Sequence, residues 1–160
     1  MVRTASSRAE LEPVTLEQLG MLERMHASVA VGAGGLSSVE LSIDAIMGYG
    51  QQGNLHGIAA ELIAAMDGGR VLSLDGPSGL ELEHGTIGRP AVRAERTLTM
   101  ALPKAALRLE TALPLVGELY LADISIPAVV YEGVGIRYRS PFSRGPIVKL
   151  EPFLDRSGHS

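Results

Sequence analysis

The stretch VLSLDGPSGL, residues 71–80, changes abruptly from apolar residues to a carboxylate followed by a glycine–proline turn. Its apolar half, residues 71–74, indicates a short strand covered on both faces, which is typical of the parallel sheet of an α/β protein. Ligands of such sheets bind at the carboxyl ends of the strands. Asp75 follows the strand directly, and residues 76–79 predict a tight turn that a ligand can approach closely beside Ser78. The stretch therefore indicates a ligand-binding site.

The composition excludes several classes of function. With 160 residues the chain fits one domain, long enough to bury about two-thirds of its unfolded surface. A net charge of −4, an aromatic content of 4% and the lack of lysine or arginine runs argue against a nucleic-acid surface. The absence of cysteine excludes disulfides and thiolate chemistry, and a cytoplasmic location is the expectation. No segment approaches the roughly 20 apolar residues of a membrane span, so we expect no membrane partner.

After residue 38 the apolar pattern predicts alternating strands and helices. A strand ending at Asp44 precedes a glycine-rich loop over 48–57, a helix over 58–66 and a strand over 70–75. This order predicts a parallel crossover, with both strand ends at one edge of the sheet. Helices on both faces of a mostly parallel sheet are the simplest architecture. Later elements are strands that finish at Lys104 and Asp123, a short helix over 127–132 and a short strand in PIVKL, residues 146–150.

The first 38 residues carry weaker signals. Residues 1–13 are polar and are expected to fray, whereas Thr15 and Gln18 resemble a capping box that opens an amphipathic helix reaching Met25. The glycines of VGAGG, residues 31–35, resemble a dinucleotide-binding loop, but no helix of suitable period follows them. We therefore expect a flexible linker there.

Two catalytic patterns are weak in this sequence. GPSGL, residues 76–80, nearly matches the nucleophile elbow of serine hydrolases, but Leu80 replaces the final glycine. A triad would also require Asp123 and His159, and the latter is one residue from the end of the given sequence. The four histidines show no metal-ligand spacing, although His56 and His84 lie on loops predicted to face the ligand crevice.

Charged residues at the ends of successive strands are a stronger signal. Asp44, Lys104 and Asp123 each have a simple explanation as a turn cap or a solvated charge. Together they lie where open sheets bind their ligands, which favours a small-molecule site at this edge.

Several motifs resemble one family in the same order and at natural spacing. They are IDAIMGYG, GIAAELI, VLSLDGPSGL, AERTLTMALPK and GELYLADISIP, and together they cover roughly residues 39–127. The family is that of the amino-terminal YjeF-type domain, the NAD(P)H-hydrate epimerases. The resemblance implies a Rossmann-like three-layer α/β/α sandwich that interconverts the R and S epimers of hydrated NADH and NADPH. It also implies a functional link to NAD(P)H-hydrate dehydratase, which converts the S form back to NADH or NADPH.

The resemblance also implies roles for individual residues. Asp44 and Ser78 look like the ligands of a potassium ion, and Asp75 falls on the aspartate that contacts the hydrated nicotinamide. An aspartate at a strand end can exchange protons as a general acid/base, and Lys104 is added as a cation facing the same crevice. The loop expected to bind the nucleotide phosphates comprises Gly48, Tyr49, Gly50, Gln51, Gln52, Gly53 and Asn54.

The chain departs from the family pattern at its start. It lacks the leading strand and GNNGGDG loop, so the fold is expected to be amino-terminally truncated relative to the family. The predicted division is a helix and linker over 1–38, a nucleotide-binding domain over 39–150 and a flexible tail over 151–160. Loss of the leading strand would expose a sheet edge that favours a homodimer. A non-catalytic remnant or nucleotide-binding module of the same fold is the alternative to an epimerase.

Overall fold

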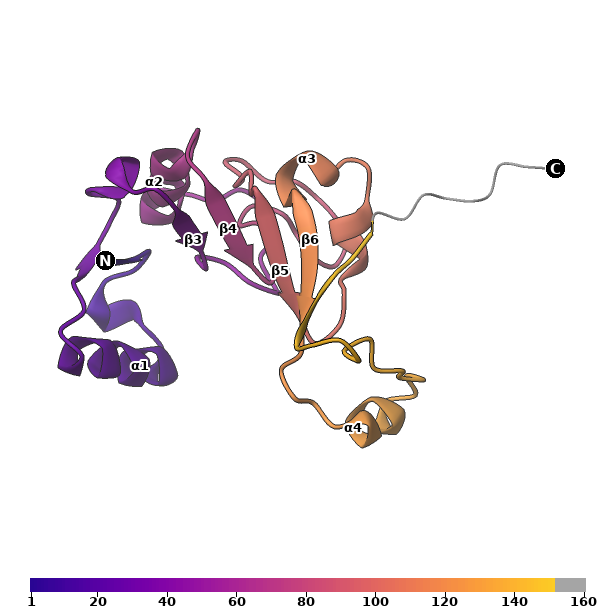
Figure 1. The fold of residues 1–160 in the computed structure, drawn as a ribbon. Coiled ribbons are helices and arrows are strands. Elements are labelled where there is room, and N and C mark those ends of the chain that lie inside the picture. Colours follow the sequence, from indigo (N-terminus) through magenta and orange to yellow (C-terminus); the bar gives the residue numbers. More distant parts are fainter. Residues whose placement is uncertain (152–160) are drawn as a thin grey trace.

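The computed structural model describes residues 1–151, so the predicted tail over 151–160, including His159, lies outside the described part except for its first residue. Its main feature is a five-stranded sheet of order β3-β4-β5-β6-β7 (Figure 1). The first four strands are parallel, and β7 is antiparallel to β6. The mostly parallel α/β class predicted from sequence is confirmed. The strands are β3 (Ser42–Asp44), β4 (Val71–Leu74), β5 (Arg96–Met100), β6 (Glu118–Ala122) and β7 (Ile147–Lys149).

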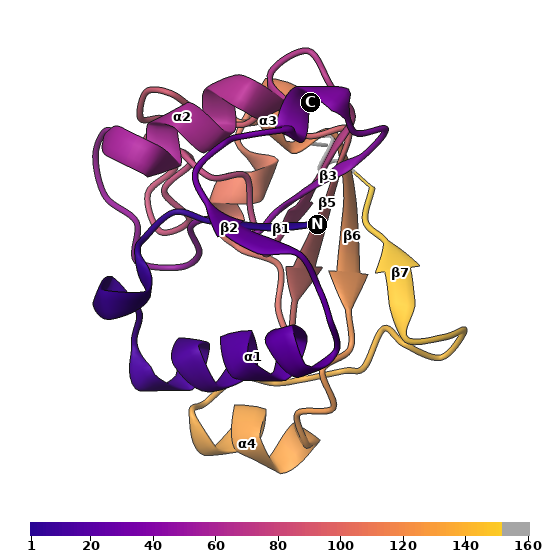
Figure 2. The same cartoon turned by 90° about the vertical axis from the view of Figure 1, so that its left-hand side faces the viewer.

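One face of this sheet is buried more completely than the other. Val71, Ser73, Thr97 and Thr99 lie on the buried face, whereas the residues alternating with them are only partly buried or exposed. In Figure 2, α2 (Gly57–Met66) and α3 (Leu113–Val116) lie on the same side of the sheet. Of the two helical layers that the resemblance implies, the one formed by α2 and α3 covers its face of the sheet more completely within residues 1–151.

Two apolar clusters form the core of the molecule. One joins α2 to β4 and to the segment before β5, through Ile63, Met66, Val71, Val92 and Ala94. The other lies around α3 and β6 and contains Leu80, Leu82, Leu107, Ala112, Leu115, Val116 and Leu119. Beyond β6, α4 (Ala128–Gly133) lies below the carboxyl ends of β5 and β6 (Figure 1). None of the helices within residues 1–151 has the length and apolar character needed to cross a membrane.

The first 38 residues are more ordered than the sequence predicts. Parallel strands β1 (Val2–Thr4) and β2 (Val29–Val31) flank helix α1 (Pro13–Arg24), so the prediction of a frayed start is wrong. The glycine-rich residues 32–35, where the sequence predicts a linker, form the turn that follows β2. The predicted capping box is also misplaced, because α1 begins at Pro13. Proline suits the first helical position, since it needs no hydrogen bond from its nitrogen. A capping box is instead made by Ser7 and Glu10 at the start of a 3-10 helix over Arg8–Glu10. Further 3-10 helices span Leu36–Ser38 and Ala105–Arg108.

An apolar groove with a volume of about 410 Å³ separates β1 from β3. Within residues 1–151, β1 pairs only with β2 and β3 pairs only with β4, so each strand has one free edge. Figure 2 shows the small sheet in front of the β3 edge of the large one. The groove is lined by side chains of β1, β3, α2 and the connection before β3, among them Val2, Leu36, Leu41, Ile43, Leu62 and Met66.

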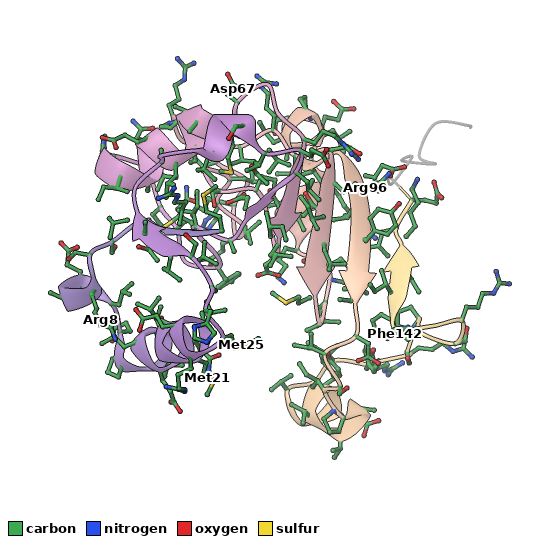
Figure 3. All side chains as sticks on the ribbon, turned by 60° about the vertical axis from the view of Figure 1, so that its left-hand side comes forward. Arg8, Met21, Met25, Asp67, Arg96 and Phe142 are labelled. Carbon is green, nitrogen blue, oxygen red and sulfur yellow. The ribbon has the colours of Figure 1, made fainter. Side chains whose placement is uncertain are left out.

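An ionic cluster joins the last three strands of the sheet. Glu118 of β6 accepts hydrogen bonds from Lys149 of β7, from Arg96 of β5 at 3.0 Å and from the hydroxyl of Tyr120 at 3.1 Å. Arg96 is the first residue of β5 and is labelled near the upper end of the sheet in Figure 3. Led by the bond from Lys149, these donors favour the ionised carboxylate and lower the pKa of Glu118 from 4.5 to about 2.

The substitution Glu118→Gln should lower the free energy of unfolding at neutral pH. Because the folded pKa of Glu118 lies below its unfolded value, its ionised form stabilises the fold fully above about pH 4.5 and loses this effect as pH falls toward 2. The stability difference from wild type should therefore shrink across that window, as measured by urea unfolding at several pH values. Glu12→Gln, at an exposed position, is the control. An equal difference at pH 7 and pH 2 would contradict the prediction.

Candidate functional site

Asp75 and Lys104 form an ion pair at the carboxyl ends of β4 and β5. Lys104 Nζ donates to Asp75 Oδ1, and it also donates to Thr99 Oγ1 at 3.2 Å and to the Met100 carbonyl at 3.0 Å. The side chains of Asp75 and Lys104 are only 15% and 19% exposed. The structure thus brings together the two residues predicted as catalytic, at the edge where an open sheet binds ligands.

The backbone at Asp75 is held in an unusual conformation. Its φ of +67° lies in the left-handed region, which costs a non-glycine residue on the order of 1 kcal/mol. Asp75 N–H donates to the Leu98 carbonyl at 2.8 Å, which attaches the residue to β5. The hydroxyl of Thr99 and the N–H of Met100 each donate to Asp75 Oδ1 at 3.3 Å. These contacts hold the carboxylate over the end of β5, and sequence reasoning missed the part of Thr99 in them.

Asp44 lies at the centre of a second, fully buried group. Its carboxylate accepts hydrogen bonds from Ser73 Oγ at 2.8 Å, from Ser78 N–H at 2.8 Å and from Ser78 Oγ at 2.6 Å. The N–H of Ile46 donates to the same carboxylate at 3.3 Å. The side chain therefore ties together β3, β4 and the turn that follows β4.

The oxygens around Asp44 fit the chemistry of a monovalent cation. Asp44 is 0% exposed and forms no ion pair within residues 1–151, so its charge has no compensating cation there. Ser78 Oγ lies beside the carboxylate, with the Met47 carbonyl at 3.5 Å from this hydroxyl oxygen. Carboxylate, hydroxyl and carbonyl oxygens are ligands that hard cations prefer. To face a cation, the Ser78 hydroxyl would have to turn its hydrogen away from Asp44.

The glycine-rich loop over 48–54 lies against the turn after β4, but two of its predicted binding side chains are engaged within the protein. Gln51 is 5% exposed, and its Oε1 accepts the Gly79 N–H at 2.8 Å. Asn54 Oδ1 accepts the Arg89 N–H at 2.9 Å. The exposed positions are Gly48, Tyr49, Gly50, Gln52 and Gly53, together with the side chain of Asn54.

Ser78, Asp123 and His84 make contacts within the protein that do not match a catalytic triad. Ser78 is 1% exposed and bonds to Asp44 rather than to a histidine, which agrees with rejecting a serine hydrolase. Asp123 accepts the Ser125 N–H at 2.8 Å, as expected for a turn-forming aspartate. His84 pairs with Glu81 at 2.9 Å, which raises the pKa of His84. His56 is the exposed residue that precedes α2.

Comparison with known proteins identifies the class. Residues 2–106 match the family described as YjeF-related protein N-terminus, and the chain belongs to this family. The matched region begins well before residue 39, where the sequence motifs that resemble the family begin. It therefore includes residues 2–38, which sequence reasoning assigns to a helix and linker.

Individual relatives support the same family. The NAD(P)H-hydrate epimerase of Dehalogenimonas lykanthroporepellens is 39% identical over 155 residues, which cover 92% of this chain and 60% of that protein. The bifunctional NAD(P)H-hydrate repair enzyme Nnr of Moorella thermoacetica is 39% identical over 90 residues, 55% of this chain and 17% of that protein. The crystal structure of yeast ynu0 matches with a TM-score of 0.66 at 19% identity, covering 88% of this chain and 62% of that chain, and shows the same fold.

Removing the buried carboxylate should destabilise the fold strongly. Asp44→Ala leaves the donors of Ser73 and Ser78 without their acceptor, and each such buried donor costs about 1–3 kcal/mol. We expect the free energy of unfolding to fall by about 3 kcal/mol or more, measured by chemical denaturation. Asp67→Ala, at the exposed end of α2 (Figure 3), is the matched control and should change stability by less than about 0.5 kcal/mol. Equal effects of the two substitutions would refute this role of Asp44.

Proposed function

We propose that this chain carries the catalytic groups of an NAD(P)H-hydrate epimerase, acting on the R and S forms of hydrated NADH and NADPH. The observation that carries the proposal is the Asp75–Lys104 pair, partly buried at the carboxyl ends of two parallel strands. The matched family and the epimerases among the relatives support the same activity. The chain spans about 60% of the length of the Dehalogenimonas relative.

Asp75 is the proposed acid/base group. The two epimers differ at the ring carbon that bears the added hydroxyl, so inversion must break and re-form a bond at that carbon while a proton moves to or from oxygen. The carboxylate is suited to this exchange because it is partly buried, yet 15% of its side chain still reaches solvent. Lys104 orients Asp75, and its other two hydrogen bonds hold the ammonium to β5.

The loop over 48–54 is the proposed binding site for the nucleotide phosphates. Its glycines allow a phosphate to approach the backbone closely, and Gly50 and Gly53 have φ values of +101° and +71°. No added Cβ at either glycine would meet another atom within 4 Å, so this surface is open. Among the relatives, the bifunctional repair enzymes support a functional link to a dehydratase that consumes the epimerase product.

A nucleotide-binding module without turnover is the second candidate. The groove between β1 and β3, which leaves one edge of each strand free within residues 1–151, favours it. An epimerisation assay distinguishes the two candidates, because a binding module would bind hydrated NADH but would not interconvert its epimers. A homodimer and a cytoplasmic location remain predictions from the sequence.

The substitution Asp75→Asn should keep the shape of the site and remove its capacity for proton exchange. Epimerisation of hydrated NADH, followed by chromatography of the R and S forms, should fall by about two to four orders of magnitude. Asp123→Asn changes an aspartate that also follows a strand but caps an exposed turn, so its rate should stay near wild type. Near-normal turnover by Asp75→Asn would rule out the assignment.

A potassium ion held by Asp44 and Ser78 is also proposed, on the basis of the uncompensated buried carboxylate. In the substrate complex it would supply positive charge near the phosphates. Nucleotide affinity should be higher in potassium than in lithium at equal ionic strength, as titration calorimetry can measure. Ser78→Ala removes one ligand oxygen and should reduce this difference, whereas Ser125→Ala, at an exposed turn, should leave it unchanged. Equal affinity in the two salts would argue against the ion.

A further inference from the structure

The turn after β4 has few backbone donors left for a ligand. Asp75 N–H donates to Leu98, Leu80 N–H donates to Pro77, and proline has no N–H of its own. Within the turn, the N–H donors of Ser78 and Gly79 bond to side chains rather than to backbone. The turn is thus shaped by acceptors that reach it from another part of the chain.

Both of these side-chain acceptors come from the segment that runs from β3 toward α2. Asp44 accepts the Ser78 N–H, and Gln51 Oε1 accepts the Gly79 N–H, each at 2.8 Å. Asp44 lies at the end of a strand, whereas Gln51 lies on the glycine-rich loop. The hydrogen bond of Gln51 therefore links that loop to the turn over 76–79, and the N–H of Met47, just before the loop, donates to Ser78 Oγ at 3.0 Å.

Gly79 is enclosed on its other side by backbone. Its φ is +98°, and an added Cβ would lie 2.5 Å from Ala91 Cα and 2.7 Å from the Pro90 carbonyl. The segment over 90–91 thus leaves no space beside Gly79, while the Gly79 N–H is bonded to the Gln51 amide. Loss of the amide acceptor would leave a buried donor unpaired, and the turn would have to shift to satisfy it.

We propose that Gln51 is a positioning residue, which holds the turn over 76–79 and thereby keeps Asp75 against Lys104. The 5% exposure of Gln51 supports a role inside the protein, whereas its neighbour Gln52 is exposed and available to a ligand. The consequence for catalysis rests on the proposed epimerase function. The consequence for the geometry of the turn does not.

The test compares Gln51→Met with Gln52→Met. Methionine has a similar length but no amide oxygen, so the first substitution removes the acceptor with little loss of volume. Two readouts do not need activity: hydrogen exchange of the Gly79 amide and the NMR signal of the Asp75 carboxyl carbon. Gln51→Met should speed exchange at Gly79 by about tenfold or more and shift the Asp75 signal. Gln52→Met should do neither, and Gln51→Glu, which keeps an acceptor oxygen, should restore the slow exchange.

Kinetics then separate positioning from binding. Gln51→Met should lower kcat by about tenfold while KM changes little, because the residue acts through Asp75 and not on the nucleotide. Unchanged exchange at Gly79, or an Asp75 signal that does not move, would overturn the proposal. So would a rise in KM at constant kcat, which marks a group that binds the ligand. If the wild-type chain shows no turnover, the proposed function fails, while the two NMR readouts still decide the role of Gln51.

Discussion

The rest of the site depends on the hydrogen bonds that the buried carboxylate of Asp44 accepts. A charge removed from water is costly unless hydrogen bonds replace its hydration, and here the donors come from Ile46, Ser73 and Ser78. These donors belong to three different segments of the chain. Satisfying one carboxylate therefore fixes β3 against β4 and fixes the turn that follows β4. Asp75 lies between β4 and that turn, so its position follows from the same constraint.

The buried face of the sheet carries a row of hydroxyl groups that extends this constraint. Ser73, Thr97 and Thr99 are each 0% exposed. Thr97 donates to the Val116 carbonyl at 2.7 Å, while Ser73 and Thr99 donate to the carboxylates of Asp44 and Asp75. Buried hydroxyls need such partners, so the strands that form the core also orient the side chains at their ends. Stability and site geometry are coupled through these bonds.

Much of this arrangement follows from local patterns. The apolar strands, the helix α2 and the parallel crossover were predictable because their periodicity and glycine boundaries are read over a few residues. Asp75 and Lys104 were predictable as a pair because strand ends in a parallel sheet converge at one edge. The start of the chain was not. The strand β1 has only three residues, and it becomes recognisable only through its pairing with β2, more than twenty positions away.

By itself, the sequence determined the fold class, the order of the elements and the residue types at the strand ends, because apolar periodicity and turn chemistry are local properties. Only the tertiary structure decided what those residues contact. It turned Gln51 inward to Gly79, placed Thr99 beside Asp75 and gave Asp44 its donors. The physical reason is that a buried polar group must find a hydrogen-bond partner, and that partner can be remote in the sequence. Gly79 is 28 positions from Gln51 along the chain, and the serines that bond to Asp44 are 29 or more positions from it.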